Sequence, residues 1–163
     1  MTKFEENILK KHGILAMAPH FHPTYASVIH TSQEQHNSIY SVTDNIELYC
    51  LLNGSSLEGR KHSSRKQFND VKNPSILISE LYAIAAFQVP CKDNLDTIWI
   101  FDVMNVVIES TSDNGSVITL RNQVKLYSAL AANLVEKRRK KAIRILHALA
   151  YSYVHSKSFG QSS

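Results

Sequence analysis

A chain of 163 residues, of which 44% are hydrophobic and 20% charged, has the composition of a single soluble domain. Its 5 Gly and 4 Pro exclude a collagen-like or low-complexity chain, and its longest apolar stretches, residues 81–90 and 97–108, are shorter than the roughly 20 residues that span a bilayer. The 18 basic and 14 acidic residues give a formal net charge of +4 and a sequence pI of about 9.1, which permits an anionic partner without identifying one.

The N-terminal forty residues contain short apolar segments interrupted by turn-forming residues. These segments are Ile8-Leu9, Gly13 to Ala18 and Tyr25 to Ile29, and Pro19 and Pro23 stand between them. The pattern predicts short strands joined by turns. Because the first residues lack a basic start followed by an apolar run, we expect a cytoplasmic protein without a secretory signal.

Residues 43–54 favour a helix. Thr43 and Asp44 are suitable capping residues, and Asn53-Gly54 is a suitable end, although a buried strand fits the same apolar residues. The following segment, residues 55–69, is polar and basic, so we expect it at the surface, partly helical and with a loop after Gly59.

The central part of the chain is rich in Ile, Val, Tyr, Phe and Trp, which is typical of strands. The predicted strands are Ser75 to Ser79, Tyr82 to Val89, Thr97 to Phe101, Met104 to Ser110 and Val117 to Leu120. Asn114-Gly115 predicts a type I′ turn between the last two. Trp99, Tyr82 and Phe87 are expected to be core or subunit-interface residues rather than stacking partners for bases.

After Asn122 the composition predicts one long helix or two consecutive helices. The apolar stripes are Leu126, Leu130 and Leu134, then Ala142, Ile145, Leu146, Leu149 and Tyr153. The first stripe can serve an internal or an intersubunit core. The overall prediction is an α+β fold with short N-terminal strands, a central antiparallel sheet and C-terminal helices, forming one domain over residues 1–155, with a flexible tail at 156–163.

Ten of the 18 basic residues fall in two clusters. The first cluster contains Arg60, Lys61, Arg65 and Lys66, and the second contains Lys137, Arg138, Arg139, Lys140, Lys141 and Arg144. Helical spacing places Lys137, Lys140, Lys141 and Arg144 on one face, where they could contact a phosphate backbone together. A solvated helix surface explains the same spacing without a ligand. The predicted DNA contacts are Arg60, Lys61, Arg65, Lys66, Lys137, Arg138, Lys140, Lys141 and Arg144.

Other motifs do not support an enzyme or a metal protein. Gly54 to Lys61 approaches the P-loop pattern, but Arg60 replaces its lysine and Lys61 its hydroxyl residue. Five histidines in the first 36 residues lack a carboxylate or Cys at ligand spacing. Cys50 and Cys91 belong to no C-x-x-C pair, so we expect two buried, reduced thiols. No catalytic residue, metal or cofactor is predicted.

The run Cys50-Leu51-Leu52-Asn53-Gly54-Ser55-Ser56-Leu57-Glu58-Gly59-Arg60-Lys61 resembles the ComK family, the competence transcription factors of Gram-positive bacteria. That family carries a Cys four positions before a Gly-Ser-Ser-x-x-Gly-Arg-Lys segment. The resemblance continues through Lys72-Asn73-Pro74-Ser75-Ile76, Phe87-Gln88-Val89-Pro90 and Trp99-Ile100 in the same order, and it covers roughly residues 46–130.

The resemblance implies a non-enzymatic activator of competence genes that recognises paired A/T-rich boxes, largely from the minor groove, as a dimer or a pair of dimers on nucleoid DNA. It also implies proteolytic control through an adaptor and a Clp-type protease. Arg60, Lys61, Arg65 and Lys66 suit the negative potential of a narrow A/T minor groove. The alternative is a protein-interaction regulator whose basic helix, residues 137–144, binds an acidic partner without DNA specificity.

Overall fold

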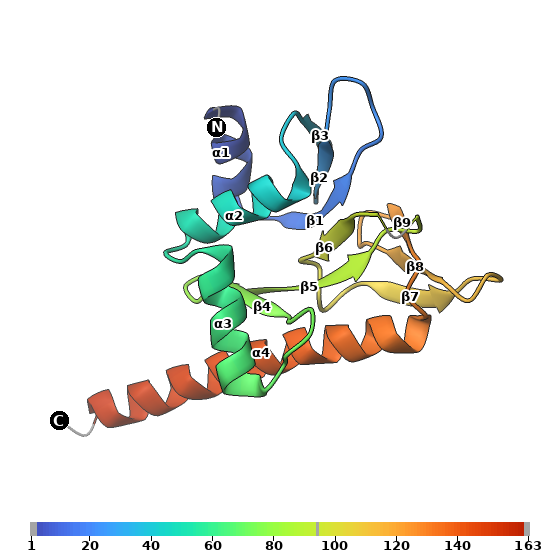
Figure 1. The fold of residues 1–163 in the computed structure, drawn as a ribbon. Helices are drawn as coiled ribbons and strands as arrows, with labels where there is room; N and C mark the ends of the chain where they lie inside the picture. The colour runs from blue at the N-terminus through green and yellow to red at the C-terminus, as the bar shows by residue number, and fades with distance from the viewer. Residues whose placement is uncertain (1–2, 94, 162–163) are drawn as a thin grey trace.

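The computed structural model describes residues 3–93 and 95–161, and their side chains up to residue 152 (Figure 1). The helices are α1 (Lys3–Lys10), α2 (Val42–Leu52), α3 (Leu57–Phe68) and α4 (Ala132–Gln161). The strands are β1 (Ile14–Pro19), β2 (Ser27–Thr31), β3 (Gln35–Ser38), β4 (Ile76–Ser79), β5 (Ile84–Pro90), β6 (Thr97–Ile100), β7 (Val107–Ser110), β8 (Ser116–Thr119) and β9 (Lys125–Ser128).

The strands form two antiparallel sheets, which confirms the predicted α+β fold. The larger sheet has the order β3-β2-β1-β6-β5-β4, and the smaller has the order β7-β8-β9. Figure 1 shows α4 running along the base of the molecule, with α1 and α2 on the opposite side of the large sheet. An isolated antiparallel β-bridge, a backbone pairing of Cys91 with Ser128, connects the two sheets.

The large sheet is buried on both faces because side chains alternate along each strand. Phe87 and Ile100, which pair across β5 and β6, point into a core shared with α4 and the small sheet. Met17 and Trp99 point into a second core shared with α1 and α2. Burying side chains of this size stabilises the fold by about 1.5–3 kcal/mol each. Phe87 and Trp99 are therefore core residues, as predicted, whereas Tyr82 is 54% exposed.

Local capping explains where α2 and α3 begin. The Ser41 Oγ accepts a hydrogen bond from the Asp44 amide at 3.1 Å, so Ser41 is the N-cap of α2. The prediction of Thr43 and Asp44 as capping residues is therefore wrong, by two and three residues respectively. The Ser56 Oγ accepts from the Gly59 amide at 2.9 Å and begins α3. The loop predicted after Gly59 is therefore helical, and α3 ends at Phe68, where the C-cap Asn69 adopts a left-handed conformation.

Three further predictions near the ends of the chain are corrected. Ile8 and Leu9 belong to α1 rather than to a strand, and both side chains are buried on its inner face. Leu126 lies in β9, because residues 125–128 pair with β8, and a single helix begins only at Ala132. Leu134 is 43% exposed, so the predicted stripe through Leu126, Leu130 and Leu134 does not exist. The second stripe is confirmed at Ala142 and Ile145, which are buried, whereas the side chain of Tyr153 lies outside the described residues.

The predicted hairpin between β7 and β8 is present, but its turn is not type I′. Ser110 pairs with Ser116, and the Thr111 amide donates to the Gly115 carbonyl. Asn114 has a φ of 65°, whereas Gly115 is not in the left-handed region. A longer loop with one left-handed residue therefore replaces the two-residue turn.

The backbone of α4 continues to Gln161 and so includes most of the segment for which the sequence predicted a tail. The flexibility of residues 156–163 and the single-domain boundary at residue 155 stay predictions.

Candidate nucleic-acid interface

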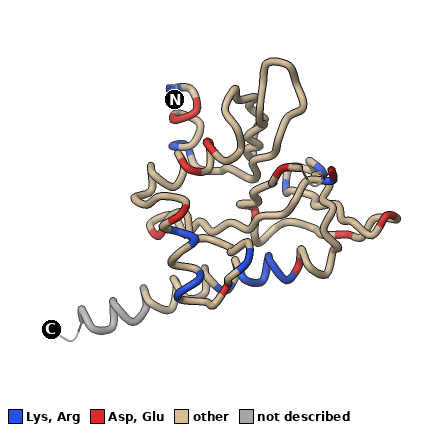
Figure 2. Tube along the Cα trace, viewed as in Figure 1, with Lys and Arg blue, Asp and Glu red and all other residues tan. Residues whose placement is uncertain are grey.

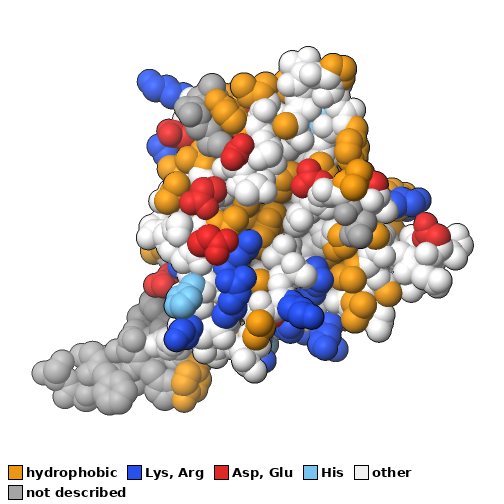
Figure 3. All heavy atoms as spheres, viewed as in Figure 1, with side chains coloured by type: hydrophobic (Ala, Val, Ile, Leu, Met, Phe, Trp, Pro, Cys, Tyr) orange, Lys and Arg blue, Asp and Glu red, His pale blue; other side chains and the backbone are white. Residues whose placement is uncertain are grey.

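The two basic clusters are brought together by the meeting of α3 with α4. The Arg144 guanidinium donates to the Phe68 carbonyl at 3.0 Å and lies 5.0 Å from the centre of the Phe68 ring. Figure 2 shows the Lys and Arg positions of both helices close to this crossing, and Figure 3 shows Lys and Arg side chains gathered over the same part of the surface. Two sequence clusters about seventy residues apart, counted from residue 66 to residue 137, therefore form one basic surface.

The cations of α3 differ in orientation. Arg60 is half-buried and donates from Nη2 to the carbonyls of Asn53 (2.9 Å) and Ile78 (3.2 Å). The Lys61 Nζ lies 3.7 Å from a carboxylate oxygen of Glu58. Arg65 and Lys66 are exposed, and the Arg65 Nε donates to the Val71 carbonyl at 3.3 Å. The outward members of the first cluster are therefore Arg65 and Lys66.

In α4 the exposed cations are Lys137, Lys140 and Arg144, which share one helical face. The neighbouring Arg138 turns inward, and its Nη1 donates to the Gln88 carbonyl at 2.8 Å. Burial lowers the pKa of Arg138, and the negative charge of Asp70 partly opposes this effect.

Lys141 is half-exposed, and its Nζ donates to the Asp70 carboxylate at 2.7 Å. Its charge is thereby offset inside the protein. Of the four predicted helical-face residues, Lys137 and Lys140 thus point to solvent. Arg144 is exposed but reaches Phe68 at the end of α3, and Lys141 joins α4 to the segment after α3.

Lys72 is an exposed cation that the sequence pattern missed. It lies between Asp70 and Ser75, both of which contact α4, so it belongs to the same region. Lys72 stands alone between the two clusters, so charge clustering could not identify it, and the only sequence signal at this position is its place in the family motif that begins at Lys72. A hollow of about 340 Å³ between α3 and α4 is lined by Gln67, Phe68 and Leu149 among others.

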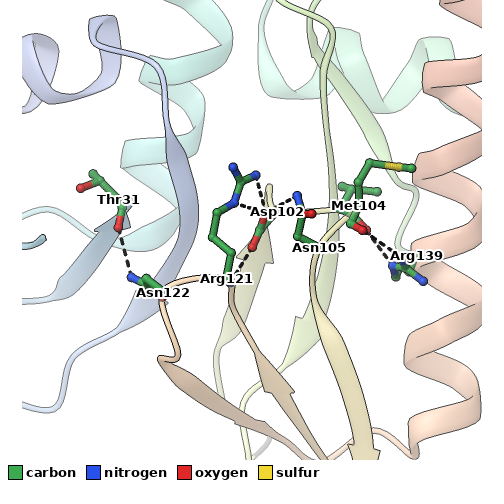
Figure 4. A network of polar contacts seen from close by, with 8 residues as sticks. Thr31, Asp102, Met104, Asn105, Arg121, Asn122 and Arg139 are labelled. Carbon is green, nitrogen blue, oxygen red and sulfur yellow. Dashed lines mark hydrogen bonds and ion pairs between the residues drawn. The ribbon is translucent and has the colours of Figure 1, made fainter. Parts of the chain in front are cut away.

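A polar network fixes α4 and the small sheet to the large sheet (Figure 4). The buried Asp102 carboxylate accepts from the Arg121 amide at 2.9 Å and from its Nε at 2.8 Å. Asn122 donates to the Thr31 carbonyl at 3.1 Å, and the Arg139 Nε donates to the Val103 carbonyl at 2.6 Å. Arg139 and Arg121 thus have structural partners, although Arg121 is half-exposed.

Two amides in the first turn of the P-loop-like segment already have acceptors within the protein. The Leu57 amide donates to the Glu47 carboxylate at 3.0 Å, and the Gly59 amide donates to Ser56. A carboxylate thus occupies the position that a phosphate oxygen would take in a nucleotide-binding loop. This geometry agrees with the sequence argument against a nucleotide-hydrolysing enzyme.

The cysteines and histidines provide no redox or metal site in the part of the chain that the structure describes. Cys50 and Cys91 are free and buried, as predicted, and burial raises the pKa of each thiol to about 12. Among the described residues, no three His, Cys, Asp or Glu side chains come close enough together to hold a metal ion. The rings of His20 and His22 stack at 5.4 Å in an exposed loop instead.

A membrane-spanning helix is likewise not found in the described residues: none of their helices combines the necessary length and apolar character.

Comparison with known proteins gives one result. The family described as ComK protein matches residues 4–152. No curated protein and no solved structure matches the chain significantly. The family consists of competence transcription factors and is not a family of enzymes. Because the match extends over most of the 163 residues, the chain belongs to the ComK family.

Proposed function

We propose that this chain activates competence genes by binding A/T-rich boxes in promoter DNA through the surface formed by α3 and α4. One observation supports this proposal above the others: exposed cations from both helices meet at one crossing in a member of a transcription-factor family. The primary contacts are Arg65, Lys66, Lys137, Lys140 and Arg144. The other predicted residues contribute positive potential, and these are Arg60, Lys61, Arg138 and Lys141. The internal contacts of Arg60, Arg138 and Lys141 fix the relative positions of α3, α4 and the large sheet.

Phosphate neutralisation supplies most of the affinity of such a surface, because each Lys or Arg that meets a phosphate releases a counterion. A narrow A/T minor groove concentrates negative potential and attracts long cationic side chains without a recognition helix in the major groove. Two boxes in one promoter require two copies of the surface, so the protein acts as a dimer or a pair of dimers. It acts on nucleoid DNA in the cytoplasm, and an adaptor with a Clp-type protease controls its amount.

The test is a titration of a fluorescent duplex that carries two A/T boxes, against a G/C-substituted duplex, at several salt concentrations. The wild type is expected to prefer the A/T duplex, with an affinity that falls steeply with salt. Replacing Lys137 and Lys140 by Ala should reduce the slope of log K against log[salt] by about 1.8, since each phosphate contact contributes about 0.9.

A matched control removes the same charge elsewhere. Lys10 and Lys11 are exposed at the end of α1, on the opposite side of the large sheet (Figure 1). Their replacement by Ala should leave the slope unchanged if binding is local to α3 and α4. Equal, weak binding of the wild type to both duplexes would reject DNA recognition. An acidic protein partner retained after nuclease treatment would then favour the protein-interaction function.

A further inference from the structure

The last residue of α3 and the short segment after it, residues 68–75, contact three positions of α4. The Phe68 carbonyl accepts from Arg144, the Asp70 carboxylate accepts from Lys141, and the Ser75 Oγ donates to the Arg138 carbonyl at 3.0 Å. Positions 138, 141 and 144 follow one another at intervals of three residues along α4, so these contacts lie along one side of the helix. The segment therefore determines where the end of α3 is held relative to α4.

Asp70 is the buried centre of this contact. Its side chain is 3% exposed, one carboxylate oxygen accepts from the Lys141 Nζ at 2.7 Å, and the other accepts from the Ser75 amide at 2.9 Å. It also lies close enough to Arg138 to raise the pKa of that guanidinium against the effect of burial. A single buried carboxylate thus connects the segment to α4 and offsets positive charge beneath a strongly basic surface.

We infer that Asp70 is a positioning residue for nucleic-acid binding: it holds the cations of α3 in register with those of α4, so that both reach one DNA molecule. This inference rests on the proposed function. Asp70 contacts no DNA itself, because its carboxylate is buried and would repel phosphate. Lys141 acts with it as a structural cation and is not a free phosphate contact.

The substitution Asp70→Asn separates this role from simple electrostatics. Asparagine has one oxygen where aspartate has two, so one of the two donors, the Lys141 ammonium or the Ser75 amide, must face an NH2 group. If charge alone mattered, removing a negative charge would tighten DNA binding and steepen the salt slope by up to about 0.9. If Asp70 positions the surface, binding weakens at least tenfold and the slope becomes shallower, although the net charge has risen.

A matched control is Glu58→Gln, which also removes one negative charge from this region. Glu58 is exposed, and its carboxylate lies 3.7 Å from the ammonium of Lys61. Its replacement should leave DNA binding unchanged or slightly tighter. Tighter binding and a steeper slope in Asp70→Asn, like the effect of Glu58→Gln, would overturn the inference.

A distance measurement tests the positioning without DNA. Spin labels on Gln67→Cys in α3 and His147→Cys in α4 occupy exposed sites, whereas the native Cys50 and Cys91 are buried. The wild-type background should give one narrow distance distribution and Asp70→Asn a broadened or shifted one. An unchanged distribution would refute the role of Asp70 even if the wild type bound no DNA, whereas a lack of wild-type binding would refute the proposed function alone.

If Asp70→Asn does not fold, Lys141→Met provides the same test from the other side of the pair. This variant keeps the Asp70 carboxylate on the Ser75 amide and removes only the contact with α4. A broadened distance distribution supports the positioning role. An unchanged distribution together with a salt slope smaller by about 0.9 would show that Lys141 is an ordinary phosphate contact and would overturn the inference.

Discussion

Replacement of Arg60 by Ala should destabilise the fold, although Arg60 belongs to a cluster that the sequence suggests is a DNA-contact surface. Its Nη2 donates to two backbone carbonyls, of Asn53 in the turn after α2 and of Ile78 in β4. These bonds connect α3 with the turn before it and with the edge strand of the large sheet. Ile78 is fully buried, so water cannot easily replace the lost donor at its carbonyl.

The magnitude follows from the two hydrogen bonds. A hydrogen bond from a charged donor contributes about 1.5–3 kcal/mol, and the half-exposed position of Arg60 reduces the gain, so we expect a loss of about 3 kcal/mol for the pair. In a chain of this length each kcal/mol lowers Tm by about 2–4 °C, which gives a decrease of roughly 6–12 °C.

Differential scanning calorimetry and urea unfolding measure this change, with Lys66→Ala as the control because Lys66 is exposed on the same helix. The control should change the free energy of unfolding by less than about 0.5 kcal/mol. A Tm of Arg60→Ala within about 2 °C of the wild type would refute the assignment of Arg60 to the fold. Arg60→Lys should restore only part of the loss, because an ammonium lacks the planar fork of a guanidinium.

Three other predictions concern the core and its connections. Asp102→Ala leaves the Arg121 amide without its acceptor, so we expect the free energy of unfolding, measured by urea titration, to fall by about 2–3 kcal/mol. A change below about 0.5 kcal/mol would contradict a stabilising role for the network of Figure 4. Burial lowers the pKa of His30 below its ordinary value of 6.5, so the unfolded chain binds a proton at this imidazole more tightly than the folded protein does. The free energy of unfolding should therefore fall as the pH drops below about 6.5, by at most about 1.4 kcal/mol per pH unit. The variant His30→Leu should show a shallower decline between pH 6.5 and 5, and equal slopes for both proteins would be evidence against the effect. In Gly115→Ala the new Cβ would lie 2.5 Å from the Ser128 carbonyl oxygen, so β8 and β9 must separate. We expect Tm to fall by an amount corresponding to about 1–3 kcal/mol. An unchanged Tm would mean that the hairpin accommodates the Cβ without loss of stability.

Elements with a strong local signal could be predicted from the sequence. The strands β4, β5, β6 and β8 coincide closely with runs of β-branched and aromatic residues between turn residues, and the apolar stripe through Ala142 and Ile145 marks the buried side of α4. The sequence predicted helix α3 only in part, because Leu57 and Ser64 are the only buried residues among its twelve and it has almost no apolar stripe. Its two caps and its packing on β4 stabilise it instead.

Elements with an ambiguous pattern were decided by tertiary pairing. Leu126, Leu130 and Leu134 recur every four residues, which is typical of a helix, but Leu126 lies in β9 because residues 125–128 complete the small sheet beside β8. Ile8 and Leu9 are too few to distinguish a strand from a helix, and α1 forms where their side chains can be buried in the core with α2. For such segments, packing and pairing with parts of the chain far away in sequence determine whether a helix or a strand forms.

The basic surface shows the same division. The sequence by itself determined the family motifs, the excess of positive charge and its concentration in two clusters. Only the tertiary structure decided which cations face solvent: Lys66 and Lys137 are exposed, whereas the ends of Arg60, Arg138 and Lys141 are held by the Ile78 carbonyl, the Gln88 carbonyl and Asp70. The physical reason is that a long cationic side chain can reach either water or an acceptor on a distant segment, and the packing of that segment determines whether the acceptor lies within reach.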